Sequence, residues 1–174
     1  MPDEAKLEAT EGATATEETT TRALDAALNF LSYRQRTGQE VRRKLMDRGF
    51  DDETIEAAMQ RLENVGLVDD ESFVAAYVRD RIAHRPMGVR RMAQELYLKG
   101  IRREEAVPLI EAALGHEGTD ELDLARRVAE RKGASLRRRD EDPALSRKRL
   151  RDHLLRRGFE SRVIQTTLDE VLPR

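Results

Sequence analysis

Cysteine and tryptophan are absent from the sequence, and aromatic residues make up only 4% of its 174 positions. The lack of cysteine excludes a disulfide framework and a thiolate metal site, and it is typical of a reducing compartment. No apolar run approaches the roughly 20 residues that a membrane-spanning helix needs, and no signal peptide opens the chain. We therefore expect a cytoplasmic protein without membrane association, whose core is built from aliphatic side chains.

Charged residues account for 38% of the chain, which suits helices that bury one face and expose the rest. The net charge of −2 hides two contrasting segments. Residues 1–21 carry a net charge of −5 and lack apolar periodicity, which predicts a disordered acidic tail. Residues 125–157 hold 13 basic and 5 acidic residues, a net charge of +8, which indicates an anionic partner such as nucleic acid or an acidic protein segment.

A ten-residue pattern occurs three times, at residues 41–50, 92–101 and 150–159. In each copy two apolar residues stand four apart, a basic residue precedes a glycine, and a large apolar residue follows it. The glycines are Gly49, Gly100 and Gly158. Apolar residues recur six and ten positions after each glycine, at Ile55, Ala106, Ile164, Met59, Ile110 and Leu168. Three matches in one register indicate tandem structural repeats.

The pattern describes a middle helix that ends at the glycine. Apolar residues four apart share one helix face, and glycine enters the left-handed conformation after a helix without a Cβ penalty. Asp51 and Glu160 then stand where polar residues begin the next helix. Thr37 with Glu40 three residues later predicts a capping box at the start of the first middle helix. The matching positions in the other repeats are Gly88 and Ser146.

A further helix precedes each middle helix, and in the first repeat Leu24, Leu28 and Leu31 recur on one face. We predict an all-α fold of three tandem three-helix, helix-turn-helix-like repeats. Because a unit of about 45 residues rarely buries enough surface alone, we expect the repeats to stack into an elongated, curved array. The predicted parts are the tail at 1–21, repeats at 22–68, 69–116 and 117–174, and a basic linker at 134–146 in the third repeat.

The sequence offers little for an enzyme. It contains no glycine-rich nucleotide-binding loop, and the histidines, which fall in different repeats, read as surface or helix-end residues. Asp69 and Asp70 could bind a metal, but a helix N-cap explains them better. Phe73 and Tyr77 could stack on bases, although their helical spacing favours the core. We expect no catalytic residues, no cofactor and no metal.

Arginine-rich segments are the main candidates for binding. They are either solvated helix faces or a surface that meets an anion. In the first two repeats the candidates are Arg34, Arg36, Arg42, Arg43, Arg79, Arg81, Arg90 and Arg91. In the third repeat they are Arg137, Arg138, Arg139, Arg147, Lys148 and Arg149.

Three segments resemble the RecX family, the bacterial modulators of the RecA recombinase. They are residues 27–41 (ALNFLSYRQRTGQEV), residues 66–81 (GLVDDESFVAAYVRDR) and residues 95–101 (ELYLKGI). The resemblance covers residues 27–114 closely and the third repeat and the acidic tail loosely. The residues that match the family motifs in structural positions are Asp69, Asp70, Phe73, Tyr77, Leu96, Lys99 and Gly100.

The resemblance implies three tandem three-helix repeats that bind in the groove of the RecA–single-stranded-DNA filament. It implies inhibition of filament growth, ATP hydrolysis, strand exchange and co-protease activity, and so a role in recombination, DNA repair and the SOS response. From the basic residues we also expect weak binding of single-stranded DNA by the protein itself, with the arginines as filament contacts, and we expect a monomer. Two alternatives are an independent nucleic-acid-binding repeat protein and a general helical scaffold for another partner.

Overall fold

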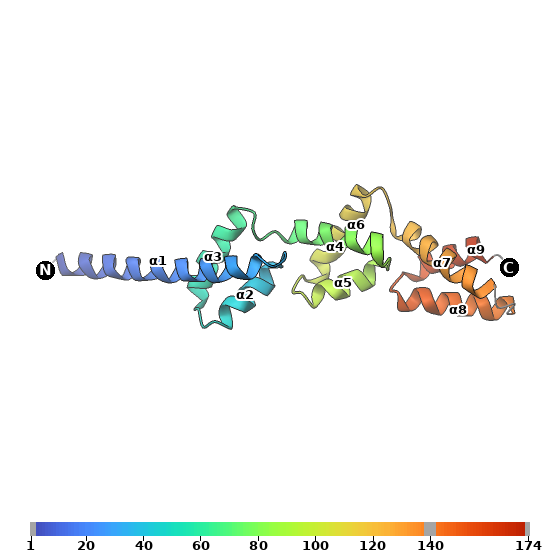
Figure 1. Cartoon of the computed structure of the whole chain (residues 1–174), viewed down its shortest axis with the longest axis horizontal. Helices are drawn as coiled ribbons and strands as arrows, with labels where there is room; N and C mark the ends of the chain where they lie inside the picture. The colour runs from blue at the N-terminus through green and yellow to red at the C-terminus, as the bar shows by residue number, and fades with distance from the viewer. Residues whose placement is uncertain (1–2, 138–141, 173–174) are drawn as a thin grey trace. The chain divides into compact units, whose positions relative to one another are not determined.

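A computed structural model describes residues 3–137 and 142–172, with side chains described for 16–135 and 142–172. Over this part of the chain the predicted all-α fold of three-helix repeats is confirmed (Figure 1). The described helices are α1 (Asp3–Leu31), α2 (Gly38–Met46), α3 (Asp52–Asn64), α4 (Asp70–His84), α5 (Val89–Tyr97), α6 (Arg103–His116), α7 (Glu121–Arg137), α8 (Pro143–Arg156) and α9 (Ser161–Val171). None of them combines the length and apolarity that a membrane crossing needs.

The chain divides into two compact units, Met1–Phe73 and Val74–Arg174. In the first unit α1, α2 and α3 pack against one another. The predicted capping box is confirmed, because the Thr37 side chain accepts from the Glu40 N–H at 3.2 Å and Glu40 Oε2 accepts from the Thr37 N–H at 3.2 Å. Asp51 caps α3 by accepting from the Thr54 N–H at 2.8 Å. These caps satisfy backbone donors that a helix start leaves without partners.

The most deeply buried apolar side chains of α1 are alanines. They are Ala23, Ala26 and Ala27, whereas Leu24 and Leu31 are partly buried against this core and Leu28 is 43% exposed. Small alanines let the backbone of α1 approach its neighbours closely. The spacing of the leucines identified the helix, but close packing against neighbouring helices favours small alanine side chains on its buried face.

Residues 3–21, which the sequence predicts to be part of a disordered tail, lie in α1, which begins at Asp3. Thr20 is only 2% exposed, and the Glu17 carboxylate pairs with the Arg61 guanidinium of α3 at 2.7 Å. Alanine and glutamate have high helix propensity, and contact with α3 adds stabilisation that periodicity of residues 1–21 alone did not indicate.

The helices α4, α5 and α6 form the middle repeat, which belongs to the second unit from Val74 onward. Tyr77 is 8% exposed, so its predicted core position is confirmed, and its hydroxyl donates to Glu95 Oε2 on α5 at 2.8 Å. The Arg81 guanidinium lies 4.4 Å from the centroid of the Tyr77 ring. Burial raises the pKa of Tyr77 to about 12, and the hydrogen bond to Glu95 adds to the rise. The hydroxyl therefore stays a hydrogen-bond donor at neutral pH.

The apolar register of the repeats is confirmed throughout. The residues eight and four positions before each repeat glycine, and six and ten after it, are at most 4% exposed. They are Val41, Leu45, Ile55, Met59, Met92, Leu96, Ala106, Ile110, Leu150, Leu154, Ile164 and Leu168. The glycines Gly49, Gly100 and Gly158 have φ values of 82°, 93° and 83°, in the left-handed region predicted for them.

The third repeat, α7 to α9, corrects two predictions. Ser146 does not begin the middle helix, because it is buried within α8 and the N-cap is Asp142, which accepts from the Leu145 N–H at 3.1 Å. Most of the described part of the predicted 134–146 linker is helical, with α7 ending at Arg137 and α8 beginning at Pro143. An aspartate cap followed by proline at the first helical position is a strong helix start, since proline has no N–H to leave unpaired.

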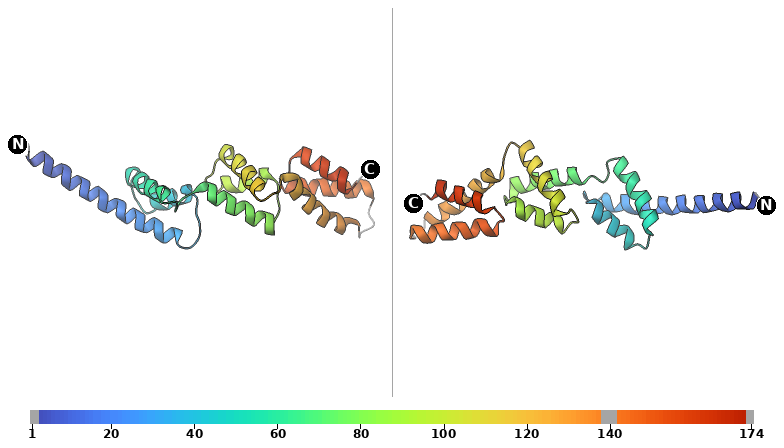
Figure 2. Two further views of the ribbon diagram at one scale, coloured as in Figure 1. Left: turned by 90° about the horizontal axis from the view of Figure 1, so that it is seen from above. Right: turned by 180° about the vertical axis from the view of Figure 1, so that it is seen from behind.

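The second and third repeats meet through their backbones in the second unit, as two adjacent three-helix groups (Figure 2). The Gly88 N–H donates to the Arg157 carbonyl at 3.0 Å, and the Arg157 guanidinium donates to the Pro86 carbonyl at 2.9 Å. The Val89 N–H donates to Glu121 Oε1 at 2.9 Å. The N-terminus of α5 is thus satisfied by groups from the third repeat, which ties the two repeats together.

Candidate nucleic-acid interface

In the first unit, most of the predicted binding arginines contact their own fold. Arg34 pairs with Glu40 at 2.9 Å, and Arg42 pairs with Glu56 of α3. Arg36 places its guanidinium 4.1 Å from the centroid of the Phe30 ring. Arg43, in contrast, is exposed and has no ion-pair partner among the described residues.

The second unit repeats this division. Arg79 pairs with Glu117 at 2.9 Å, and Arg81 pairs with Glu95 at 3.2 Å. Arg91 donates to Glu95 at 3.3 Å and to the Arg156 carbonyl of the third repeat at 3.1 Å. Its neighbour Arg90 is exposed and has no ion pair within the described part of the chain.

A regularity emerges from neighbouring arginines along the chain. In four such pairs one guanidinium joins an internal ion pair, and the other is exposed without one among the described residues. The engaged member is Arg42, Arg91, Arg102 or Arg126, and its exposed neighbour is Arg43, Arg90, Arg103 or Arg127. The exposed members are the ones that can bind a partner without dismantling the fold.

The third-repeat candidates divide in another way. Arg147 pairs with Asp169 and donates to the carbonyls of Leu168 at 3.0 Å and Leu172 at 2.7 Å, so it closes the C-terminal end of α9. Lys148 and Arg149 are exposed on α8. Arg137 is the last residue of α7, and Arg138 and Arg139 lie outside the described residues.

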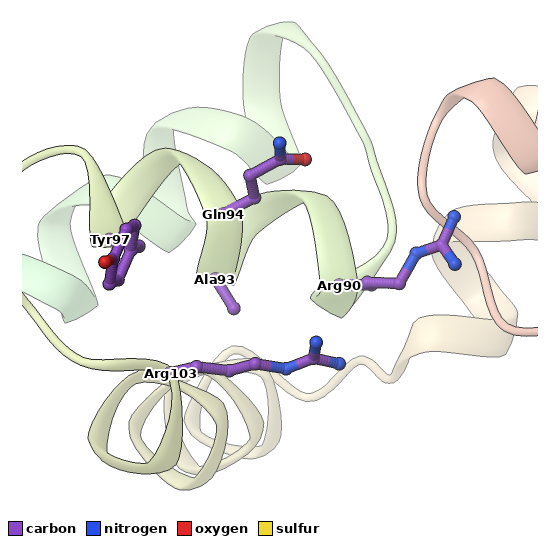
Figure 3. Close-up of a pocket in the computed structure, with 5 residues that line it drawn as sticks. All are labelled: Arg90, Ala93, Gln94, Tyr97 and Arg103. Carbon is purple, nitrogen blue, oxygen red and sulfur yellow. The ribbon is translucent and has the colours of Figure 1, made fainter.

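A pocket of about 400 Å³ opens between α5 and α6 and is lined by Arg90, Ala93, Gln94, Tyr97 and Arg103. Figure 3 shows the Arg90 and Arg103 side chains extending toward the same end of the pocket, with Tyr97 at the other end. Tyr97 is 62% exposed, an unusual position for a large aromatic ring. An exposed ring that shares a pocket with two guanidinium groups, neither ion-paired among the described residues, can stack on a base while the cations contact phosphate.

The sequence analysis did not single out Tyr97 or Arg103, although the position of Tyr97 in the repeat pattern could have indicated it. The position three residues before each repeat glycine lies next to the buried leucine and holds Met46, Tyr97 or Leu155. These side chains are 57%, 62% and 46% exposed. Each repeat thus exposes one large side chain at the same position of the pattern. Nothing local distinguished Arg103 from Arg102.

The family-motif residues serve the structure. Asp69 caps α4, accepting from the Ser72 N–H at 3.0 Å, and the hydrogen bonds from Ser72 lower the pKa of this carboxyl. Asp70 accepts from the Gly38 N–H at 2.9 Å, which ties the start of α2 to the start of α4 within the first unit. Among the described residues no group of three or more His, Asp or Glu side chains could hold a metal ion.

Helices, caps and exposed arginines together define a class: a tandem three-helix repeat protein with basic surfaces. Three family models match consecutive parts of the chain: the first three-helix domain of RecX at residues 23–62, the second at 69–114 and the third at 119–168. Together they span most of the sequence. The chain belongs to the RecX family.

Similar proteins support this assignment. The regulatory protein RecX of Prosthecochloris aestuarii is 36% identical over 156 residues, which cover 88% of this chain and 95% of that protein. The regulatory protein RecX of Amycolatopsis mediterranei is 34% identical over 158 residues, covering 90% and 86%. The crystal structure of RecX from Lactobacillus salivarius aligns with a TM-score of 0.76 at 25% identity, covering 89% of this chain and 97% of that one.

Proposed function

We propose that this protein regulates RecA by binding the RecA–single-stranded-DNA filament and restraining its growth. Because less RecA is then assembled on single-stranded DNA, ATP hydrolysis, strand exchange and co-protease activity all decrease. The observation that carries the proposal is the consecutive match of all three RecX domain models over residues 23–168. The relatives that match nearly the whole chain are named regulatory proteins, which favours regulation over catalysis.

The surfaces of the repeats suit such a composite target. A nucleoprotein filament offers phosphate groups and protein side chains side by side. Each repeat carries a large exposed apolar residue, at Met46, Tyr97 or Leu155, and exposed cations such as Arg43 and Arg90 lie on the same middle helices. Cations can contact phosphate while the apolar side chains pack against protein.

The direct test is a titration of RecA ATP hydrolysis on single-stranded DNA with the purified chain. We expect hydrolysis to slow at well below one copy of this protein per RecA, since blocking growth at a filament end affects many subunits. No change at equimolar protein would contradict the proposal. An Arg90→Ala, Arg103→Ala double variant should inhibit less, whereas Arg162→Ala, which removes an exposed cation of α9, should inhibit as the unmodified protein does.

A second candidate function is nucleic-acid binding that does not depend on RecA. The pocket beside Tyr97 favours it, because a ring and two guanidinium groups suffice to bind a strand. This function predicts affinity for single-stranded DNA in the absence of RecA that falls steeply with salt. If DNA binding without RecA is strong and RecA ATP hydrolysis is unaffected, this second function replaces the first.

A further inference from the structure

A second pocket, of about 260 Å³, lies where the end of α4 meets α7 and α8 in the second unit. Five of its lining residues are permanently cationic: Arg85, Arg127, Arg131, Lys132 and Arg157. His84 and His153 also line it, and among the described residues no acidic side chain does. We call this pocket the cationic cleft. It takes cations from both the second and the third repeat.

None of the five cations has an ion pair within the described part of the chain. Arg85, Arg127 and Arg131 are exposed. The contrast with Arg126, the residue before Arg127, is direct, because Arg126 pairs with Asp123 at 3.0 Å and with Glu170 at 2.8 Å. The fold therefore neutralises one arginine of α7 twice and its neighbour not at all.

The cations also repel one another. Burial lowers the pKa of Arg157, and the nearby guanidinium groups of Arg85, Arg91 and Arg131 lower it further. Like charges held together without a counter-charge destabilise the folded state. An anion that enters the cleft would relieve this repulsion across the junction of the two repeats.

We propose that the cationic cleft binds phosphate groups of a nucleic-acid strand. Guanidinium groups donate two parallel N–H bonds, a geometry that matches phosphate oxygens. Cations from three elements suit a strand, which brings one negative charge per nucleotide. Among the described lining residues only Pro86 and Val128 are apolar, so they offer little contact to the apolar parts of a peptide. The choice of a nucleic acid as ligand rests on the proposed function.

The cationic cleft lies at the junction of the second and third repeats. Arg85 follows the last helical residue of α4 in the second repeat, and Arg157 follows α8 in the third. A phosphate between them would bridge the repeats, and a ligand that binds the folded state stabilises it in proportion to the logarithm of its concentration. Strand binding should therefore raise the melting temperature of the chain.

The test uses the full-length chain without RecA and a fluorescent single-stranded oligothymidylate as the probe. The cleft variant is Arg127→Ala with Arg131→Ala. The matched control is Arg22→Ala with Arg162→Ala, which removes two other exposed cations. Affinity is measured over a salt series, and ligand-free melting by circular dichroism checks the fold. Because Arg127 and Arg131 are exposed and have no ion pair among the described residues, the cleft variant should melt at the same temperature as the unmodified chain.

We expect the cleft variant to bind more weakly, with the slope of log affinity against log salt reduced by about 0.7 for each phosphate that the variant no longer neutralises. The control should keep its slope. Equal slopes for the two variants would overturn the proposal. The proposal would also be overturned if the cleft variant lost only the binding of polyglutamate, because the cleft would then bind acidic protein. It would be overturned as well if the variant lost only the binding of inorganic phosphate, because the cleft would then bind a small phosphate compound.

The RecA titration separates this proposal from the proposed function. If the cleft variant loses oligothymidylate affinity but still slows RecA ATP hydrolysis, the phosphate site stands and regulation does not depend on it. If the unmodified chain has no effect on RecA, yet its affinity for oligothymidylate depends on Arg127 and Arg131, the proposed function fails and the phosphate site stands.

Discussion

Gly88 and Gly158 touch across the junction of the second and third repeats. A Cβ atom added to Gly88 would lie 2.3 Å from the Gly158 carbonyl oxygen. The backbone of Gly88 has φ −72° and ψ 158°, a conformation that any residue adopts. Glycine is therefore required at this helix cap by space and not by backbone conformation. Gly158 meets both demands, since its φ is +83° and an added Cβ would lie 2.4 Å from the Arg91 Cβ.

We predict that Gly88→Ala lowers the free energy of unfolding by about 1–3 kcal/mol, because the backbone of the third repeat must move to admit a methyl group. Chemical denaturation measures the loss. Gly115→Ala is the control, since an added Cβ there meets nothing within 4 Å. Alanine within a helix should leave stability unchanged or raise it by up to about 1 kcal/mol. Equal effects for the two variants would contradict the contact across the junction.

Leu96 is fully buried between the helices of the second repeat, whereas Leu98, two residues later, is 77% exposed. Leu96→Ala should cost about 2–5 kcal/mol of unfolding free energy through lost burial and the cavity that remains. Leu98→Ala should change stability by no more than about 0.5 kcal/mol. Urea denaturation of both variants checks the prediction, and a small loss for Leu96→Ala would show that the repeat register is wrong.

Tyr97 should contribute to strand binding through its ring. Tyr97→Ala is expected to weaken oligothymidylate binding by about 1–3 kcal/mol, the range for one base stacked on an aromatic side chain. Tyr97→Phe keeps the ring and should retain most of the affinity. Because the side chain is 62% exposed, neither change should disturb the fold. Fluorescence anisotropy distinguishes the variants, and equal losses for alanine and phenylalanine would exclude stacking.

Stability should fall with acidification in part through His153. Burial lowers the pKa of His153, and the charges of Arg157, Lys132 and Arg156 lower it further. In the unfolded chain its pKa is about 6.5, so the unfolded state binds the proton first as pH falls. The free energy of unfolding therefore decreases from about pH 7 downward until the folded pKa is passed. His153→Gln should show a smaller decrease in urea denaturation over this window; an identical decrease would exclude the contribution.

The sequence by itself identified the repeats because their signals are local and periodic. Leu45, Leu96 and Leu154 fall in one register with the glycine four residues later, and burial confirms all three. The Thr37 cap needed only Glu40, three residues away. Other features depended on packing that the sequence does not display: the leucines of α1 identified a helix, but its most deeply buried apolar side chains are alanines, and Asp142, not Ser146, caps α8.

Tertiary structure decided which arginines can bind a partner. The acidic residue that engages an arginine can be far away in the chain, as Glu170 is from Arg126 at a separation of 44 residues. No sequence pattern distinguishes Arg126 from Arg127, yet the fold neutralises the first and leaves the second in the cationic cleft. Helices, turns and caps follow from short-range sterics and hydrogen bonding, which the sequence displays. The balance of charge at a surface follows from segments that only folding brings together.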